Sequence, residues 1–501
     1  MFNARGKSLR KRVSLQRKLN AFDLTSLVVG SIIGADIYIA AAIGAKLVGP
    51  ASLLVWILAG GIAVVISLSF AYCATKWPRV GGPYAYVREL SNPQSAFMVG
   101  WALLLAEWFS LAVFPVAFVQ YLSALVTINN SLLEAALKGL FIVIVLGTNI
   151  IGIKAAGRFN DMLTLVKLSP LLLLIVSGLF FMLSKPTYVA SNFAPFVTGT
   201  AGGFGQALVL IFWAYAGFEL STLPADEIES PRKTIPKAII IGMLIVISFY
   251  LLTNLVIIGS VDQATLSKSQ SPLMDSASEI FSPWSSLSKI APVIVGVGAL
   301  VSILGADESG TIGTSRLAFA LSLDGLMPKA FSKIHGRFQT PYFSLSVLCL
   351  TAFVASTFGS LVQLINASVF LLALVYFSTC IAAIGLRRRT PGESAIGYVI
   401  PVVGAGFTVV LMALVGPMQI GVSLLLLLCG LPIYILFSPK KELRDLKGAF
   451  FSREAVLRRA YDQGERFLAY PWRRILWLSY RIRHGTKPWV VHEDQQGNRS
   501  N

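Results

Sequence analysis

Apolar runs of about 20 residues follow one another along the chain from Ala21 to Phe437. Each run is long enough to form a helix across a bilayer core of roughly 30 Å. A few such runs would fit inside a large soluble protein, but the twelve that we count would not. The charged residues agree, because they make up only 13% of the chain, against about 25% of an ordinary soluble domain. The sequence therefore predicts an all-α membrane protein with about twelve transmembrane helices.

The distribution of Lys and Arg predicts how these helices are oriented. The predicted spans begin near residues 22, 50, 95, 131, 158, 202, 235, 287, 340, 362, 395 and 417. If the N-terminus lies in the cytoplasm, most basic residues between the spans fall in cytoplasmic loops, as membrane orientation requires. The net charge of +18 then reflects orientation rather than binding to nucleic acid. We expect a multi-pass protein of the plasma membrane with both termini in the cytoplasm.

Three regions differ in composition. Residues 1–20 form a basic N-terminus, residues 21–438 a transmembrane domain, and residues 439–501 a basic tail. In the tail, Arg pairs alternate with Phe, Leu, Trp and Tyr between Phe450 and Tyr480. This pattern predicts a basic amphipathic helix on the inner membrane surface, and a helix that docks on a partner protein is the alternative.

Glycines interrupt the first predicted span. Gly30 and Gly34 lie near its middle, with Ser31 between them and Asp36 two residues after Gly34. Glycine permits an unwound backbone, which a membrane tolerates only where a ligand or cavity satisfies the freed polar groups. The half-helix that follows would offer N–H groups and a positive dipole end to an anion. The alternative is a glycine contact for close helix packing, but the neighbouring acid favours a site.

The sixth predicted span repeats this feature. Gly217 lies near its middle, and Glu219 follows two residues later. Interrupted segments at matching positions in two halves of a chain are the sequence pattern that best locates a transporter's binding site. The pattern predicts two inverted repeats, at about residues 21–185 and 200–388, followed by two peripheral helices at about 395–437.

Four motifs in this order resemble those of the amino acid–polyamine–organocation family of permeases. The first is the interrupted stretch Gly30–Tyr38, and the second is the loop Trp77–Tyr86, which carries Pro-x-x-Gly-Gly-x-Tyr-x-Tyr. The third runs from Phe212 through Gly-Phe-Glu to Ile-Pro-x-Ala-Ile at residue 239. The fourth joins Arg316 to the stretch from Asp324 to Pro341. The resemblance covers roughly residues 20–440.

The resemblance implies a leucine-transporter-type fold in which helices one and six are broken and which takes up or exchanges amino acids or amines. It places the substrate carboxylate on backbone N–H groups of Ser31, Ile33, Gly34 and Ala35. It places the substrate amino group on carbonyls near Phe212, Trp213 and Tyr215, just before Gly217. Trp213 falls at the position of the aromatic residue that covers the substrate in some members of the family. A tryptophan of the core or of the membrane interface is the alternative.

One residue departs from the family pattern. The last glycine of the span-one motif is Asp36 in this chain. A carboxylate at an anion site repels a carboxylate ligand and attracts an ammonium group or a proton. Asp36 therefore raises the expectation of a cationic substrate.

A lysine inside a membrane is costly and is a candidate for function. Lys167 lies in the fifth span, where proton-coupled relatives carry a lysine near the first break. Our hypothesis is that its ammonium group replaces a coupling cation by holding carbonyls of the break. A side chain that reaches the cytoplasmic surface is the alternative.

Four acids also lie within predicted spans. Glu219 and Glu107 are expected either to couple neighbouring helices or to act directly in the site. Asp307 and Glu308 are adjacent, so they point about 100° apart on a helix. We expect Asp307 to face the outer vestibule, and we expect Asp307 and Glu308 with Asp36 to form an acidic entry that concentrates cations.

These features favour a secondary active transporter, namely a proton-coupled amino acid permease that works by alternating access. A polyamine or cationic amino acid transporter or exchanger is the alternative. A sensor that signals through the tail and a channel, which would need a repeated filter, fit less well. We expect no enzyme activity, no cofactor and no metal site. The expected partners are a small-molecule substrate (an amino acid or amine), protons and the lipid bilayer.

Overall fold

The computed structural model describes residues 19–438, except residues 129, 152, 224, 226, 227, 391 and 393. The side chains of residues 153–163 and 396 also lie outside the description. The basic N-terminus up to residue 18 and the tail from residue 439 lie outside the described residues, so the amphipathic tail helix stays a prediction.

The described residues are helical almost throughout. An isolated parallel bridge joins Leu19 to Ile228, and no longer strand occurs in the described ranges. The helices are α1 (Ala21–Ile32), α2 (Ala35–Val48), α3 (Ser52–Lys76), α4 (Pro83–Leu90), α5 (Pro93–Leu125), α6 (Ser131–Ile151), α7 (Ile153–Ser184), α8 (Pro186–Asn192), α9 (Ala201–Trp213), α10 (Pro231–Ser260), α11 (Gln263–Leu266), α12 (Pro272–Ile280), α13 (Leu287–Leu323), α14 (Tyr342–Phe358), α15 (Leu361–Arg388), α16 (Ile396–Leu414), α17 (Pro417–Leu428) and α18 (Gly430–Phe437). Short 3₁₀ helices lie at Gly49–Ala51 (η1), Phe218–Thr222 (η2) and Lys329–Ser332 (η4).

The prediction of an all-α membrane protein is confirmed. Among the described residues, 10 helical segments are long and apolar enough to cross a membrane. The first of them, Ala21–Lys76, contains α1, α2 and α3 and so covers two predicted spans. The ninth predicted span corresponds to α14, an apolar helix of 17 residues. The count of twelve and the inverted repeats stay predictions.

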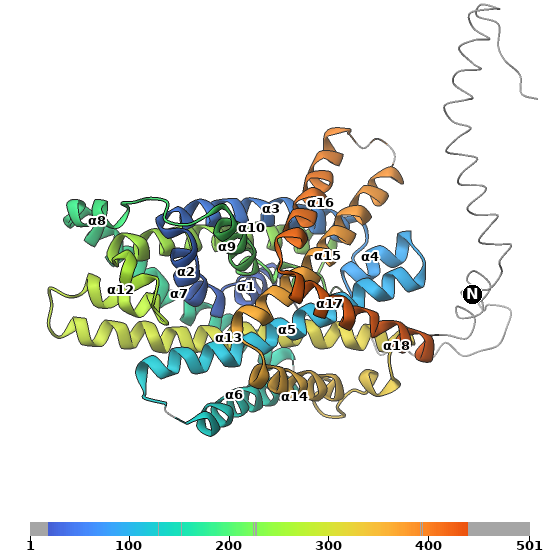
Figure 1. Cartoon of the computed structure of the whole chain (residues 1–501). Coiled ribbons are helices and arrows are strands. Elements are labelled where there is room, and N and C mark those ends of the chain that lie inside the picture. Colours follow the sequence, from blue (N-terminus) through green and yellow to red (C-terminus); the bar gives the residue numbers. More distant parts are fainter. Residues whose placement is uncertain are drawn as a thin grey trace, which may run out of the picture. The chain divides into compact units, whose positions relative to one another are not determined.

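Burial separates central helices from peripheral ones. In the most apolar part of Pro93–Leu125, 78% of the residues are buried, but in Ser131–Ile151 and in Pro417–Phe437 only 17% are. The peripheral helices expose apolar side chains such as Leu132 and Val143, as lipid-facing helices do. In Figure 1 the long helices α5 and α13 run side by side, and α1 and α2 pack against α13. The polar groups of the two breaks are thus enclosed by helices rather than by lipid.

Candidate functional site

The first predicted span is broken between α1 and α2. Ile33 and Gly34 belong to neither helix, and their φ/ψ angles of −75°/99° and −144°/−135° leave the helical path. The Ile33 N–H still closes α1 by donating to the Val29 carbonyl at 2.9 Å. The break therefore frees carbonyls at the end of α1 and N–H groups at the start of α2.

Side chains from other helices bind the freed carbonyls. Lys167 of α7 is fully buried, and its Nζ donates to the carbonyl of Gly30 at 2.6 Å and to that of Ile33 at 2.7 Å. The Ser302 hydroxyl of α13 also donates to the Ile33 carbonyl, at 3.3 Å. The Lys167 side chain thus points into the break rather than toward a surface.

Asp36 binds the N-terminus of the second half-helix. Its Oδ1 accepts the Gly34 N–H at 2.7 Å, and its Oδ2 accepts a short hydrogen bond from the Tyr250 hydroxyl of α10. The Tyr250 hydroxyl also lies 2.9 Å from the Ile32 carbonyl. The family resemblance assigns the N–H groups of Gly34 and Ile33 to the substrate carboxylate. In this structure the Gly34 N–H instead binds Asp36, and the Ile33 N–H is bound within α1.

The sixth predicted span is broken in a similar way. α9 ends at Trp213, a turn follows, and η2 begins at Phe218. Gly217 has a φ of +121°, a conformation that side-chain-bearing residues rarely adopt. Its N–H donates to Glu219 Oε1 and Oε2 at 3.1 and 3.0 Å, and the Tyr376 hydroxyl of α15 donates to Oε2 at 2.8 Å. In both breaks an acid two residues after a glycine binds the N–H of that glycine.

The two breaks touch each other. The Ser31 hydroxyl donates to the Gly217 carbonyl at 3.1 Å. A Cβ atom at Gly217 would lie 3.1 Å from the Ser31 backbone, so a larger residue would crowd this contact. The glycine thus serves two needs, a positive φ and a close approach of two chain segments.

A small pocket of about 30 Å³ lies at this meeting point, well below the roughly 300–1,000 Å³ of an open small-molecule site. The breaks supply one part of its wall: Ser31, Ile32, Asp36, Trp213, Ala216, Gly217, Glu219 and Leu220. Helices α5, α13 and α15 supply the rest: Glu107, Ser110, Leu111, Phe114, Ala306, Gly310 and Leu372. The site is therefore a chamber between two broken helices and three continuous ones.

Comparison with known proteins agrees with this geometry. The chain matches the amino acid permease family over residues 19–440. It belongs to that family. The permease is 28% identical over 462 residues to the methylthioribose transporter of Bacillus subtilis, which covers 86% of this chain and 96% of the relative. It is 29% identical over 455 residues to the branched-chain amino acid permease of the same organism, covering 85% and 94%. It is 28% identical over 444 residues to the human cystine/glutamate transporter, covering 85% and 86%.

The predicted site residues of the permease divide into two groups. Those that line the pocket are Ser31, Asp36, Glu107, Trp213, Gly217 and Glu219. Those that do not are Ile33, Gly34, Ala35, Lys167, Phe212, Tyr215 and Asp307. The resemblance assigns the Phe212 and Trp213 carbonyls to the substrate amino group. Within the turn, the Phe212 carbonyl accepts the Tyr215 N–H and the Trp213 carbonyl accepts the Ala216 N–H, both at 3.0 Å.

Sequence reasoning missed most of the wall that α5, α13 and α15 contribute, except Glu107, and three residues of the breaks. The sequences of α5 and α13 carry no clear amphipathic stripe, so they do not indicate which face meets the pocket. The residues missed are Ile32, Ser110, Leu111, Phe114, Ala216, Leu220, Ala306, Gly310 and Leu372. Ser110 offers the one weak signal, because it is a polar residue three positions after Glu107 and so lies on the same helix face.

Trp213 joins the span-six break to α5. Its Nε1 donates to the Ser110 hydroxyl at 2.8 Å, and its ring centroid lies 6.2 Å from that of Phe114. Only 4% of Trp213 is exposed. The ring is therefore held at the pocket wall by a polar contact at one end and an aromatic contact along its side.

Three carboxyl groups face the pocket, and no Lys or Arg does among its lining residues. Asp36 and Glu219 are bound by glycine N–H groups as described. Glu107 of α5 is 4% exposed, interacts electrostatically with Glu219, and has no hydrogen-bond partner for its Oε1 in the described structure. The chamber therefore presents acceptor oxygens and is suited to a ligand that carries an amino group.

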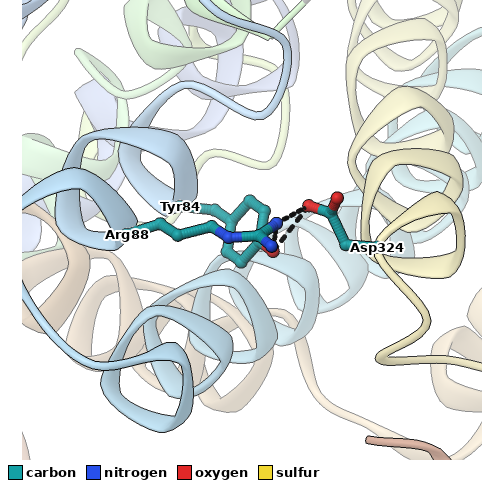
Figure 2. A network of polar contacts seen from close by, with 3 residues as sticks. All are labelled: Tyr84, Arg88 and Asp324. Carbon is teal, nitrogen blue, oxygen red and sulfur yellow. Dashed lines mark hydrogen bonds and ion pairs between the residues drawn. The ribbon is translucent and has the colours of Figure 1, made fainter. Parts of the chain in front are cut away.

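A polar network lies away from the pocket, between α4 and the end of α13 (Figure 2). Asp324 accepts the Tyr84 hydroxyl at 2.7 Å and forms a close ion pair with Arg88. Arg88 also donates to the Tyr84 hydroxyl, at 2.8 Å. The Gly-Gly-x-Tyr loop and the stretch after α13, two of the family motifs, thus meet through these side chains.

We expect this ion pair to contribute little to stability. The Arg88 and Asp324 side chains are 39% and 36% exposed, and solvent-screened pairs contribute about 0–1 kcal/mol. A double-mutant cycle of Arg88→Gln and Asp324→Asn, followed by denaturation in mixed micelles, should give a coupling free energy below about 1 kcal/mol. A coupling several times larger would mean that the network acts as a structural lock.

Proposed function

We propose that the chain is a proton-coupled amino acid permease of the plasma membrane, with both termini in the cytoplasm. The solute binds in the chamber between the two breaks, and alternating access opens this chamber to one side of the membrane at a time. Meeting half-helices near the middle of the membrane are the usual site in secondary transporters. The breaks fit this role because the two halves of a broken helix can tilt relative to each other without disrupting the hydrogen bonds of an intact helix.

The observation that carries the proton coupling is the position of Lys167. Its ammonium group lies where a bound cation would otherwise hold the carbonyls of Gly30 and Ile33. A charged amine donates strong hydrogen bonds to both carbonyls, and loss of its proton weakens this clamp. Protonation of Lys167 therefore favours one arrangement of α1 against α7, and deprotonation favours another. Asp36 lies close enough to interact electrostatically with Lys167, so its own charge changes the balance.

A second candidate is a carrier of cationic amino acids or amines. Asp36, Glu107 and Glu219 give the chamber an acidic wall, and the Gly34 N–H is already bound by Asp36. A ligand with two amino groups would use this wall better than a ligand with one carboxylate. Family membership does not decide the matter, because one relative is named for methylthioribose and another for branched-chain amino acids.

Uptake into liposomes by the purified permease tests both candidates. With one proton carried per solute, a gradient of one pH unit, alkaline inside, should sustain about tenfold accumulation, because one pH unit corresponds to about 1.4 kcal/mol. Unlabelled leucine, glutamate, lysine and putrescine then compete with the labelled solute. Competition by leucine alone supports the amino acid permease, and competition by lysine and putrescine supports the second candidate. Accumulation that does not respond to the pH gradient contradicts the coupling.

A further inference from the structure

A second group of buried carboxyls lies on α13, outside the pocket. Ala306 and Gly310 of α13 line the pocket, whereas Glu308 is turned about 200° from Ala306 around the helix. Asp307 and Glu308 are each 1% exposed, and neither lines the pocket. The mechanism proposed above does not use either residue.

Glu308 is bound by α6. Its Oε2 accepts the Thr148 hydroxyl at 2.6 Å and the Asn149 Nδ2 at 2.8 Å. Asn149 is 2% exposed and also donates from Nδ2 to the Val145 carbonyl at 3.0 Å. Both partners of Nδ2 are acceptors, which fixes the amide orientation and leaves the Asn149 Oδ1 beside the acid.

Several oxygen atoms of this group lack a donor. Both carboxyl oxygens of Asp307, the Oε1 of Glu308 and the Oδ1 of Asn149 have no hydrogen-bond partner in the described part of the chain. Buried acceptors are nearly always paired, because leaving them unpaired costs the hydration that they lose. The Asn149 amide oxygen adds a neutral, buried acceptor without a donor next to the Glu308 carboxyl that its Nδ2 binds.

No Lys or Arg among the described residues supplies the missing hydrogen-bond donor. The ionisable groups that interact with Asp307 and Glu308 are each other and the Cys349 thiol of α14, which contributes no positive charge. Neither carboxyl forms an ion pair with a Lys or Arg of the described residues. Two ionised carboxylates at adjacent positions would repel each other in a dry environment, where charges are costly.

We propose that Asp307 and Glu308 form a proton-binding site at the contact of α6, α13 and α14, separate from the solute pocket. At least one proton, on Asp307, is bound in the folded protein. A protonated Asp307 carries no charge, so it can lie buried without the cation that its surroundings do not provide. Removal of the proton leaves a charge beside Glu308 and Cys349, so proton binding holds α13 against α6 and α14. The proposal stands whichever solute the chamber carries.

Infrared spectroscopy of the purified full-length protein in lipid tests the proposal. The carbonyl stretching band of a protonated carboxylic acid is distinct from the bands of a carboxylate. At neutral pH we expect Asp307→Asn to lose one such band and Glu229→Gln, which alters an exposed acid, to lose none. An Asp307→Asn spectrum identical to that of the wild type in this region overturns the proposal.

Two further arms keep the test decisive. If Asp307→Asn does not fold, Glu308→Gln serves instead, because it changes the carboxyl that interacts electrostatically with Asp307 and should therefore shift the Asp307 band. An unshifted band contradicts the proposal. Excess sodium chloride at constant pH tests the other small cation that carboxylates bind. Loss of the Asp307 band on addition of sodium would identify a sodium site and overturn the proton assignment.

Discussion

Lys167→Ala is expected to abolish pH-gradient-driven accumulation, so that the internal concentration of solute in liposomes no longer exceeds the external one. The substitution removes the ammonium group that holds the Gly30 and Ile33 carbonyls. Hydrogen bonds to a charged group contribute about 1.5–3 kcal/mol each, so the two contacts together are large enough to fix the position of α1. Without them the break loses the ammonium group whose protonation drives coupling in this proposal, and uptake should become passive.

Lys237→Ala is the matched control for this prediction. Lys237 is an exposed lysine on α10, so its substitution changes the net charge equally but removes no buried contact. It should accumulate solute like the wild type. Normal gradient-driven accumulation by Lys167→Ala, in protein that elutes as a single species, would remove Lys167 from the coupling mechanism.

The second large effect is expected from Gly34→Ala. A Cβ atom at this position would lie 2.4 Å from the Cβ of Ala306 and 3.0 Å from the ring of Phe114. Both neighbours line the pocket, so they cannot move without changing its shape. Overpacking of a buried site costs about 1–3 kcal/mol. Transport should therefore fall by about tenfold or more, because about 1.4 kcal/mol corresponds to a factor of ten.

Gly61→Ala provides the comparison for Gly34→Ala. Gly61 is an exposed glycine within α3, and a Cβ atom there would meet nothing within 4 Å. Alanine should be tolerated or slightly stabilising at this site, because it favours the helix more than glycine does. Equal transport rates in the two variants would show that the close approach at Gly34 has no role in transport.

The positions of the two breaks could be predicted because glycine and an adjacent acid stand out in an apolar run. The sequence indicated interruptions at Gly30 and Gly34 and again at Gly217, and the helices end at Ile32 and Trp213. Lys167 stood out because a charged residue in a membrane span is rare, and the family resemblance implied its place near the first break. Single polar residues against an apolar background are therefore the informative part of such a sequence.

The contacts inside the site could not be predicted for a physical reason. Helix α5 and the second half of α13, from Ser302 onward, are buried on most sides, so their sequences carry no amphipathic stripe that fixes their rotation. The facing of Ser110 toward Trp213, and of Ala306 toward Gly34, depends on how several helices pack together. The binding of Asp36 to the Gly34 N–H depends on the side-chain rotamer, which the family motif does not contain.

Substrate protection of a single cysteine tests the central claim most directly. Ser110→Cys places a thiol on the pocket wall, and Ser123→Cys places one on the exposed end of the same helix. Both are made with Cys429→Ser, which removes the exposed native thiol, because the other three cysteines are buried. We predict that a saturating transported solute slows thiol modification at position 110 and leaves it unchanged at position 123. Equal modification rates at position 110 with and without the solute would contradict a binding site between the two breaks.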